Sequence, residues 1–412
     1  MANDLYPVNA PVQGVNQSFF PKHIVKQLFR QYVGEFPFSI FTGLDPRNPI
    51  VIHKMKPGEG LAYTVGQLNS IDYRKPVINF NQVSGNGQKA IIDEFTVATK
   101  KLSFLYTVEG ADILEQGTPL DIPGNVRPLL LEACQRNLNM CILESAMYKQ
   151  DTSTPNNGGY LPATQKPSYD RVVLAGIAPG GATLAVGPSL ADRTAYYAKA
   201  GITTAWNAMT GGVDFETNGL SAKHLMRLKS VAAAGGYRVG ATLVKGTVEN
   251  KIPPAYMRTY KGAPAHQYLY FCSPESYAQL TEDPAYYRVT LARGVVTSPN
   301  QPDMISGASY RGEFNGIHIY EVEQLSEYVL PSQDGNKRIA WELFVGAGAW
   351  SLGWSKMPRI SFKPDVTNSI DEYTTHELRG QEAVKFAAKQ ADTLAAGILR
   401  VEQGIIHSFV RV

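Results

Sequence analysis

The stretch "YLYFCSPESYAQL", residues 268–280, changes character at a single cysteine. The residues before Cys272 are aromatic and apolar, which favours a buried β-strand. Ser273 and Pro274 are typical of the N-cap and first turn of a helix. The pattern therefore predicts a strand over 268–272 and a helix that begins near Ser273. A cysteine at a helix N-terminus can have a lowered pKa, so Cys272 is also a candidate nucleophile.

No catalytic partner supports the nucleophile interpretation of Cys272. His266 precedes it by six residues, which in an extended strand is roughly 20 Å, too far for a general base. The other two cysteines, Cys134 and Cys141, lie on the packing stripe of a predicted helix, where they would fill the core. Three cysteines, an odd and small number, also do not predict a disulfide framework. Cys272 is interpreted as a buried structural residue.

Other motifs that can carry chemistry are incomplete. Gly346 and Gly348 fit the start of a dinucleotide loop, but Gly353 comes two residues too late. His376 and Glu377 have no second histidine at the spacing that a zinc protease requires. We expect no catalytic, cofactor-binding or metal-binding residues, no cofactor and no enzymatic activity.

The composition points to a chain that buries its surface against other protein. Charged residues make up 18% of the 412 residues, against about 25% in an average protein, and there are 22 tyrosines. Protein interfaces are poor in charge and rich in tyrosine, so we expect an oligomer. A net charge of +3 does not indicate general affinity for nucleic acid or membranes. We expect no signal peptide and no membrane span, and folding in a reducing cytoplasm.

Three helices are predicted from apolar periodicity. Residues 20–33 form a short helix with Lys22, Lys26 and Arg30 along one side. That basic stripe is either a solvated face or a contact with an acidic neighbour or with phosphates. Residues 127–149 form the longest helix, and residues 221–236 form another with Ser221 as its N-cap.

Residues 50–110 have a β pattern. Leu102, Phe104, Tyr106 and Val108 occupy alternate positions in a long strand-like stretch, residues 89–108. A long hairpin of this kind cannot bury both faces within its own subunit, so we expect one face to lie on a neighbour.

The remaining segments are shorter. Asn315-Gly316 predicts a tight hairpin, and residues 338–350 predict a buried strand that runs into a glycine turn. Residues 151–218 are rich in Gly, Pro, Thr and Asn and predict an elaborated loop with a helix near 191–209.

In this order, the segments resemble the major capsid protein of tailed bacteriophages. The segments that carry the resemblance are "YLYFCSPESYAQLTEDPAYY", "ISGASYRGEFNGIHIYE", "LFVGAGAW" and "ELRGQEAVKFAAKQADTLAAGILRV". Within that group the chain looks most like the enquatrovirus-like short-tailed phages (schitoviruses). The resemblance implies an α+β capsid fold and a subunit that assembles into hexamers and pentamers of an icosahedral shell around double-stranded DNA.

The resemblance also implies a division of the chain. Residues 1–49 become the N-terminal arm, 50–110 the E-loop, 111–150 the P-domain with its spine helix, 151–214 a loop-rich insertion, 215–335 the A-domain, and 336–412 the end of the A-domain and the return to the P-domain. Implied partners are other copies of the chain, a portal protein at one vertex, scaffolding or decoration proteins, and packaged DNA bound without sequence specificity. The implied location is the virion, after assembly in the bacterial cytoplasm.

Candidate intersubunit contacts are the basic helix stripe and the alternating strand, namely Lys22, Lys26, Arg30, Leu102, Phe104 and Tyr106. Two alternatives stay open at this point. The first is a soluble enzyme that depends on a cysteine or a histidine, and the second is a minor or decorating protein of a virion shell.

Overall fold

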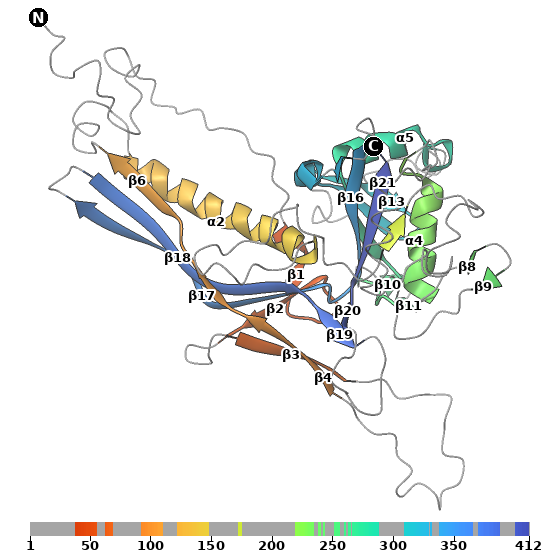
Figure 1. Cartoon of the computed structure of the whole chain (residues 1–412), viewed down its shortest axis with the longest axis horizontal. Helices are drawn as coiled ribbons and strands as arrows, with labels where there is room; N and C mark the ends of the chain where they lie inside the picture. Colours follow the sequence, from red (N-terminus) through yellow and green to blue (C-terminus); the bar gives the residue numbers. More distant parts are fainter. Residues whose placement is uncertain are drawn as a thin grey trace, which may run out of the picture.

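The computed structural model is an α+β structure in which two β-sheets meet end to end, as Figure 1 shows. The α+β class is the one predicted from the sequence. The residues that the structure describes are 38–55, 62–68, 92–109, 122–147, 172–174, 219–234, 238–239, 242–243, 251–255, 259–260, 263–264, 266–287, 309–328, 330–331, 338–365, 370–387 and 400–411. The predicted helices at 20–33 and near 191–209 lie outside these ranges.

A seven-stranded sheet forms the core of the compact part on the right of Figure 1. Its strand order is β13-β14-β12-β16-β21-β7, and β15 pairs with β16. The strands are β7 (Val172–Leu174), β12 (Tyr268–Cys272), β13 (Tyr310–Phe314), β14 (Ile317–Glu321), β15 (Leu330–Pro331), β16 (Arg338–Val345) and β21 (Ile405–Arg411). Helices α4 (Ala222–Ala234) and α5 (Pro274–Glu282) accompany this sheet.

The strand-to-helix corner at Cys272 is confirmed. All five residues of β12 are buried, because the strand lies inside the sheet and both faces of the sheet are covered. Leu269 and Phe271 pack in one apolar cluster, and Tyr268, Tyr270 and Cys272 pack in another. Helix α5 begins at Pro274, and the Oγ atom of Ser273 accepts a hydrogen bond from the backbone N–H of Ser276 at 3.3 Å. Ser273 is therefore the N-cap that the sequence predicts.

Two further local predictions are also confirmed. Asn315 and Gly316 join β13 to β14 with φ angles of +50° and +78°, the two positive values that a tight type I′ turn requires. Ser221 caps α4 by accepting a hydrogen bond from the N–H of His224 at 3.3 Å. The helix ends at Ala234, within the predicted range.

A six-stranded sheet forms the elongated part of the molecule. Its strands are β1 (Thr42–Gly43), β2 (Ile50–Lys54), β5 (Lys100–Leu102), β6 (Leu105–Glu109), β17 (Trp350–Asp365) and β18 (Ile370–Ala383). Strands β17 and β18 form its long axis, and helix α2 (Ile122–Met147) lies along one face. The sequence interpretation missed both long strands.

Helix α2 begins five residues before the predicted start. Pro128 lies inside the helix as a result of this earlier start. Pro123 and Gly124 form part of the first turn, where a missing proline N–H has no cost. The predicted packing stripe is confirmed, since Leu130, Cys134 and Cys141 are buried.

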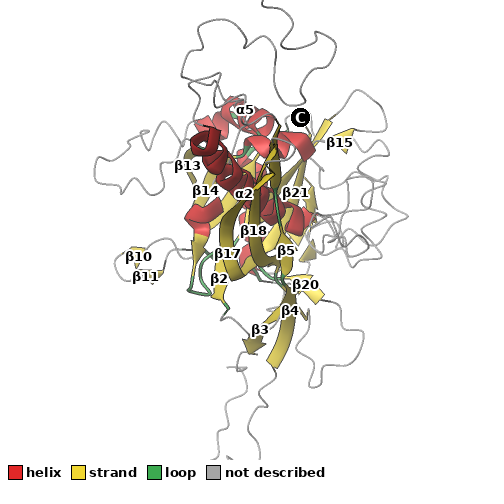
Figure 2. Ribbon diagram, turned by 90° about the vertical axis from the view of Figure 1, so that its left-hand side faces the viewer, coloured by secondary structure: helices red, strands yellow, loops and turns green. Residues whose placement is uncertain are grey.

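The predicted long strand at 89–108 is wrong, because it is three separate strands. The first, β4 (Ile92–Ala98), pairs with β3 (Ala62–Leu68) in a hairpin, whereas β5 and β6 pair with β18. Figure 2 shows this hairpin projecting from the six-stranded sheet. In the described residues its apolar side chains pack against Val384 and Phe386 of the same subunit. The predicted contact of the other face with a neighbouring subunit stays a prediction.

A pair of glycines makes room for that hairpin. Gly353 of β17 and Gly380 of β18 lie directly opposite each other. A Cβ atom on Gly353 would lie 2.4 Å from the ring of Tyr63, and one on Gly380 would lie 2.6 Å from the carbonyl oxygen of Ala98. The absence of two side chains therefore allows β3 and β4 to cross the sheet in close contact.

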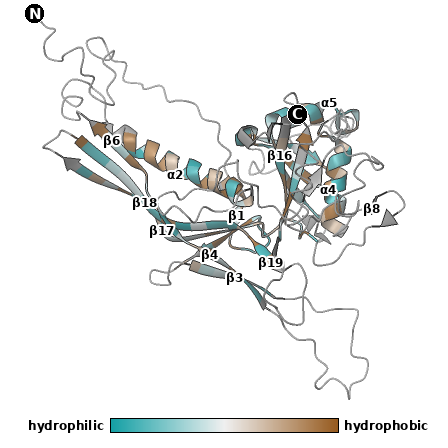
Figure 3. Cartoon of the chain, in the orientation of Figure 1, coloured by the Kyte–Doolittle hydropathy of each residue, from teal (hydrophilic) through white to brown (hydrophobic). Residues whose placement is uncertain are grey.

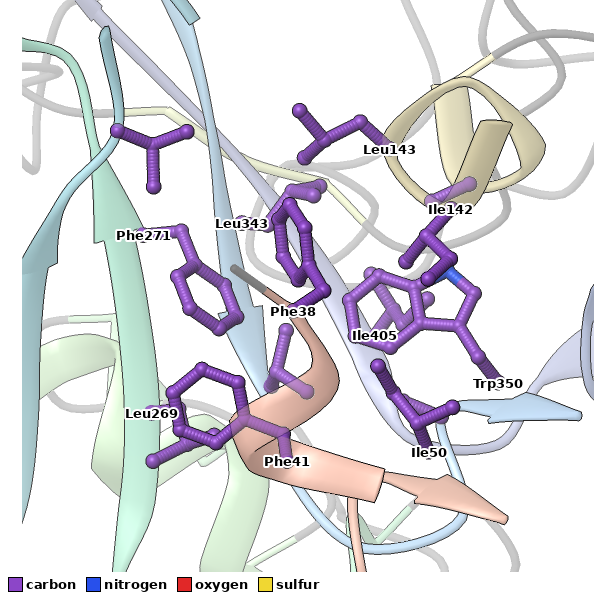
Figure 4. Close-up of a cluster of buried hydrophobic side chains, with 14 of the residues drawn as sticks. Phe38, Phe41, Ile50, Ile142, Leu143, Leu269, Phe271, Leu343, Trp350 and Ile405 are labelled. Carbon is purple, nitrogen blue, oxygen red and sulfur yellow. The ribbon is translucent and has the colours of Figure 1, made fainter. Parts of the chain in front are cut away.

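The two sheets are joined by one continuous apolar core (Figure 4). Phe38 packs edge-to-face between Phe271 of the seven-stranded sheet and Trp350 of the six-stranded sheet, with ring centroids 5.4 and 6.3 Å apart. Ile142 and Leu143 of α2 close the cluster from the side. The chain also passes directly between the sheets, since β16 continues into β17 through the predicted glycine turn.

The remaining described elements are short. They are the 3-10 helices Phe38–Phe41 and Glu323–Tyr328 and the strands β8 (Arg238–Val239), β9 (Thr242–Leu243), β10 (Thr259–Tyr260), β11 (Ala263–Pro264), β19 (Lys385–Ala387) and β20 (Arg400–Glu402).

Candidate assembly interface

A buried ion pair holds α2 onto the six-stranded sheet. Arg379 of β18 is 1% exposed and donates to the Oε1 atom of Glu377 at 2.6 Å. It also donates to the side-chain oxygen of Asn137 and, at 3.5 Å, to the carbonyl of Cys134, both on α2. Gln381 accepts a further hydrogen bond at 3.2 Å. A buried charge with this many partners is a structural element that fixes how the helix lies on the sheet.

A second buried network crosses the seven-stranded sheet. Tyr270 donates to the carboxylate of Glu342 and lies 3.2 Å from the hydroxyl of Ser408, which in turn lies 2.8 Å from Nε2 of His224. Burial raises the pKa of Glu342 to about 7, partly offset by hydrogen bonds from Ser276 and Tyr270. Burial and the nearby Arg227 lower the pKa of His224 to about 3. Glu342 and His224 are therefore both uncharged between about pH 3 and about pH 7.

A third buried network of hydrogen bonds connects β16, β21 and β20. Trp341 donates its indole N–H to Nδ1 of His407 at 3.0 Å. Because an indole nitrogen can only donate, Nδ1 must accept, and Nε2 carries the hydrogen that is donated to Glu402 at 2.8 Å. Lys385 lies 3.6 Å from the other carboxylate oxygen of Glu402.

These networks contain side chains that also occur in active sites. Ser408 and His224 are 0% and 2% exposed, and Glu402 and His407 are each 0% exposed. A substrate cannot reach groups that the core covers completely, so the contacts stabilise the fold. Within the described residues, no group of three or more His, Cys, Asp or Glu side chains is placed to hold a metal ion. No described helix has both the length and the apolar run that a membrane crossing needs.

Cys272 has the environment of a core residue. Its side chain is 0% exposed, and its thiol lies 3.5 Å from the carbonyl oxygen of Tyr320. Burial raises the pKa of the thiol well above its ordinary value, and the carboxylates of Glu342 and Glu321 add to this rise. The thiolate that a nucleophile requires is therefore disfavoured, as the sequence interpretation holds.

We predict that Cys272→Ala lowers the free energy of unfolding by about 1 kcal/mol, because only a small buried group is lost. A thiol reagent should leave Cys272 unmodified in the folded chain. Mass spectrometry of the labelled, digested protein reads this directly. Rapid labelling of Cys272 under native conditions would contradict the assignment.

The structure describes three of the six residues predicted to make intersubunit contacts. Lys22, Lys26 and Arg30 lie outside the described residues. Leu102, Phe104 and Tyr106 lie on the face of the six-stranded sheet that α2 of the same subunit covers.

Phe104 and Tyr106 differ in how completely α2 covers them. Phe104 packs against Val126 and Leu130 of α2, so it contributes to the subunit's own core. Tyr106 is 46% exposed, and it lies directly opposite the buried Tyr373. Tyr106 is therefore available for a contact with another molecule, whereas Phe104 is largely occupied.

Several apolar side chains are exposed at the far end of the elongated part. Phe362 of β17 is 48% exposed, and its ring lies 4.9 Å from that of Tyr373. Leu105 of β6 is 61% exposed, and Leu131 of α2 is 45% exposed. Figure 3 shows this hydrophobic colouring along β6 and the adjoining half of α2. The sequence interpretation identified Tyr106 but missed Phe362, because it missed strand β17.

Comparison with solved structures identifies the fold. The chain is similar to the capsid asymmetric unit of cyanophage Pam1, with a TM-score of 0.62 and 13% identity over 96% of this chain and 98% of that chain. It is similar to the capsid structure of Helicobacter pylori bacteriophage KHP30, with a TM-score of 0.61 and 10% identity over 98% and 99% of the two chains. The capsid of Ralstonia phage GP4 gives 0.59 and 12%, over 97% of each chain.

Sequence comparison adds no relative, since no family model and no curated protein matches the chain. At 10–13% identity the similarity lies in the fold alone. That fold is the one found in phage capsids, and it extends over nearly the whole chain.

Proposed function

We propose that this chain is the major capsid protein of a tailed bacteriophage, a subunit that assembles into the hexamers and pentamers of an icosahedral shell around double-stranded DNA. The observation that carries the proposal is the full-length similarity to a phage capsid chain, which covers 96% of this chain and 98% of the other. Coverage of both chains means that nearly all of the subunit has a counterpart, so the similarity is not that of one shared domain.

The surface of the subunit supports the same function. The buried polar networks leave no accessible catalytic group among them, whereas Leu105, Tyr106 and Phe362 expose apolar area at the far end of the elongated part. Exposed apolar side chains of this kind mark surfaces that bind protein. An elongated subunit with exposed apolar side chains at one end is suited to repeated contacts with copies of itself.

The finer assignments rest on the sequence segments. We propose that the phage belongs with the enquatrovirus-like short-tailed phages, because the ordered segments resemble that branch. The expected partners are a portal protein at one vertex, scaffolding or decoration proteins, and DNA on the inner face of the shell. The expected division into N-terminal arm, E-loop, P-domain and A-domain belongs to the same proposal, as do the contacts assigned to Lys22, Lys26 and Arg30.

Copy number in purified particles tests the proposed function. A major capsid protein is the most abundant protein of the particle by mass, present in hundreds of copies, and a decorating protein or an enzyme is not. Quantitative mass spectrometry of virions, with the portal protein as an internal reference, reads this ratio. A few copies per particle would refute the proposal.

Tyr106 and Phe104 provide a matched pair of variants for the contact surface. Tyr106→Asp should leave the free energy of unfolding nearly unchanged, because the side chain is half exposed, but should reduce particle formation. Phe104→Asp should destabilise the subunit itself by about 2–4 kcal/mol, because it places a charge against Val126 and Leu130. Sedimentation and urea unfolding of both variants separate the two effects. Normal particles from Tyr106→Asp would remove Tyr106 from the interface.

A further inference from the structure

The face of the six-stranded sheet opposite α2 is arranged in four rows across three strands. Each row joins a residue of β5, of β6 or of the link between them with neighbouring residues of β18 and β17. The rows are Lys101–Leu378–Lys356, Ser103–His376–Arg359, Leu105–Thr374–Ser361 and Thr107–Glu372–Lys363. Their neighbours along β18, such as Thr375 and Glu377, are buried on the α2 side, so the twelve residues share the other side, which we call the open face.

The open face is exposed and basic. Lys101, Lys356, Arg359 and Lys363 are all exposed, whereas Glu372 is the acidic residue among the twelve. The face therefore carries four positive side chains against one negative side chain. The balance of four positive and one negative side chain on this face equals the formal net charge of the whole chain, +3.

The open face also has apolar positions between its charges. Leu105 is 61% exposed, and Leu378 is half-buried between Lys101 and Lys356. A ligand that covers this face would gain from burying Leu105 as well as from pairing with the cations.

The dimensions of the open face match one helix. Three strands about 4.8 Å apart give a width of about 10 Å, and four rows two residues apart give a length of about 20 Å. An α-helix is about 10–12 Å wide, and about 14 residues span 20 Å. Helix α2 already covers the opposite face of the same strands, so a second helix would complete a three-layer arrangement.

We propose that the open face is a docking site for an acidic amphipathic helix of another polypeptide. Glutamate or aspartate side chains of that helix would pair with Lys101, Lys356, Arg359 and Lys363, and an apolar side chain would cover Leu105. A nucleic acid fits the face less well, because its charged backbone would not bury the exposed side chain of Leu105. The inference concerns one face of a single subunit and does not depend on the proposed function.

A synthetic peptide tests this proposal. The probe is a fluorescein-labelled helix of about 14 residues with glutamates on one side, two leucines between them and alanines elsewhere. Fluorescence anisotropy with the full-length chain should show saturable binding that weakens about tenfold between about 50 mM and about 500 mM salt. A DNA duplex of similar length and charge is measured beside it.

Two charge-reversal variants decide where the peptide binds. In the first, Lys356, Arg359 and Lys363 are replaced by glutamate. In the second, the exposed Arg127, Lys223 and Lys251 are replaced by glutamate, which changes the net charge by the same amount away from the open face. The first variant should bind the peptide at least about tenfold more weakly than the wild type, and the second should bind within about twofold.

Three results would overturn the proposal. They are the absence of peptide binding to the wild type, equal weakening in both variants, and binding of DNA but not peptide that is lost in the first variant. Because the substitutions are at exposed positions, circular dichroism should show that both variants fold. Sedimentation of the same samples reports particle formation separately, so failure of peptide binding cannot be confused with failure of assembly.

Discussion

Replacing Arg379 with alanine is expected to lower the free energy of unfolding by about 3–5 kcal/mol, the largest effect of any single substitution considered for this chain. Arg379 is fully buried, and its removal leaves the carboxylate of Glu377 in the core without its cation. Asn137 and the carbonyl of Cys134 on α2 lose a donor at the same time. Urea unfolding followed by circular dichroism measures the loss.

A double variant separates the lost charge pair from lost packing. Arg379→Met with Glu377→Leu removes both charges and keeps the volume, so it should recover most of the stability. Arg136→Ala is a matched control, because Arg136 pairs with Glu132 on the partly exposed side of α2 and should cost less than about 1 kcal/mol. Equal losses in Arg379→Ala and Arg136→Ala would show that the buried pair has no special role.

The pH dependence of stability should change when Glu342 is replaced by glutamine. Burial raises the pKa of Glu342 from 4.5 to about 7, so the folded chain keeps a proton that the unfolded chain has lost. The stability that this proton confers is complete below about pH 4.5 and is lost as the pH rises to about 7. Glutamine stays neutral, so Glu342→Gln should gain about 3 kcal/mol relative to the wild type between about pH 5 and about pH 8.

The contribution of His224 to stability depends on pH in the opposite direction, but it does not affect the comparison of the wild type with Glu342→Gln. Its pKa is lowered from 6.5 to about 3, so its contribution is present above about pH 6.5 and is lost as the pH falls toward 3. Both proteins contain His224, and the difference between them isolates Glu342. Glu282→Gln, on the exposed surface of α5, controls for the loss of one negative charge. A difference between Glu342→Gln and wild type that is constant with pH would contradict the prediction.

The sequence is most informative where local chemistry determines the backbone. Ser273 and Pro274 specify the start of α5, and Asn315-Gly316 specifies the turn between β13 and β14, because few other residues satisfy these conformations. The likeness to phage capsid proteins follows from the order of such segments. The comparisons confirm the fold that this likeness implies.

The long strands β17 and β18 were not predicted from the sequence, because the side of β18 that faces α2 is polar. Thr375, Glu377, Arg379 and Gln381 of β18 are buried, yet all are hydrophilic, so the alternation of apolar residues that marks a strand is absent. Two register shifts in β17 between Trp354 and Arg359 further obscure its period. The pairing of Arg379 with Glu377 and α2, which makes this burial possible, depends on segments about 240 residues apart and is not a local property.

For the candidate interface, the alternation of Leu102, Phe104 and Tyr106 correctly indicates one face of the sheet, although Leu102 lies in β5 and Tyr106 in β6. It does not indicate what covers that face. The structure shows that α2 of the same subunit covers Phe104, whereas Tyr106 is 46% exposed. Coverage of a sheet by a distant helix is decided by tertiary packing, which periodicity does not contain.

The position of β21 has a consequence for when the subunit can fold. Residues 405–411 lie in the interior of the seven-stranded sheet, between β16 and β7, and Ile405 shares a core with Phe38. A chain that is still being synthesised cannot complete this sheet before residue 411 has left the ribosome, which at about 5–20 residues per second takes about 20–80 seconds. Every chain that is still being synthesised on a messenger RNA therefore lacks the complete hydrophobic core. Until then the edge of β16 that pairs with β21 stays unpaired, and an unpaired strand edge can associate with another chain.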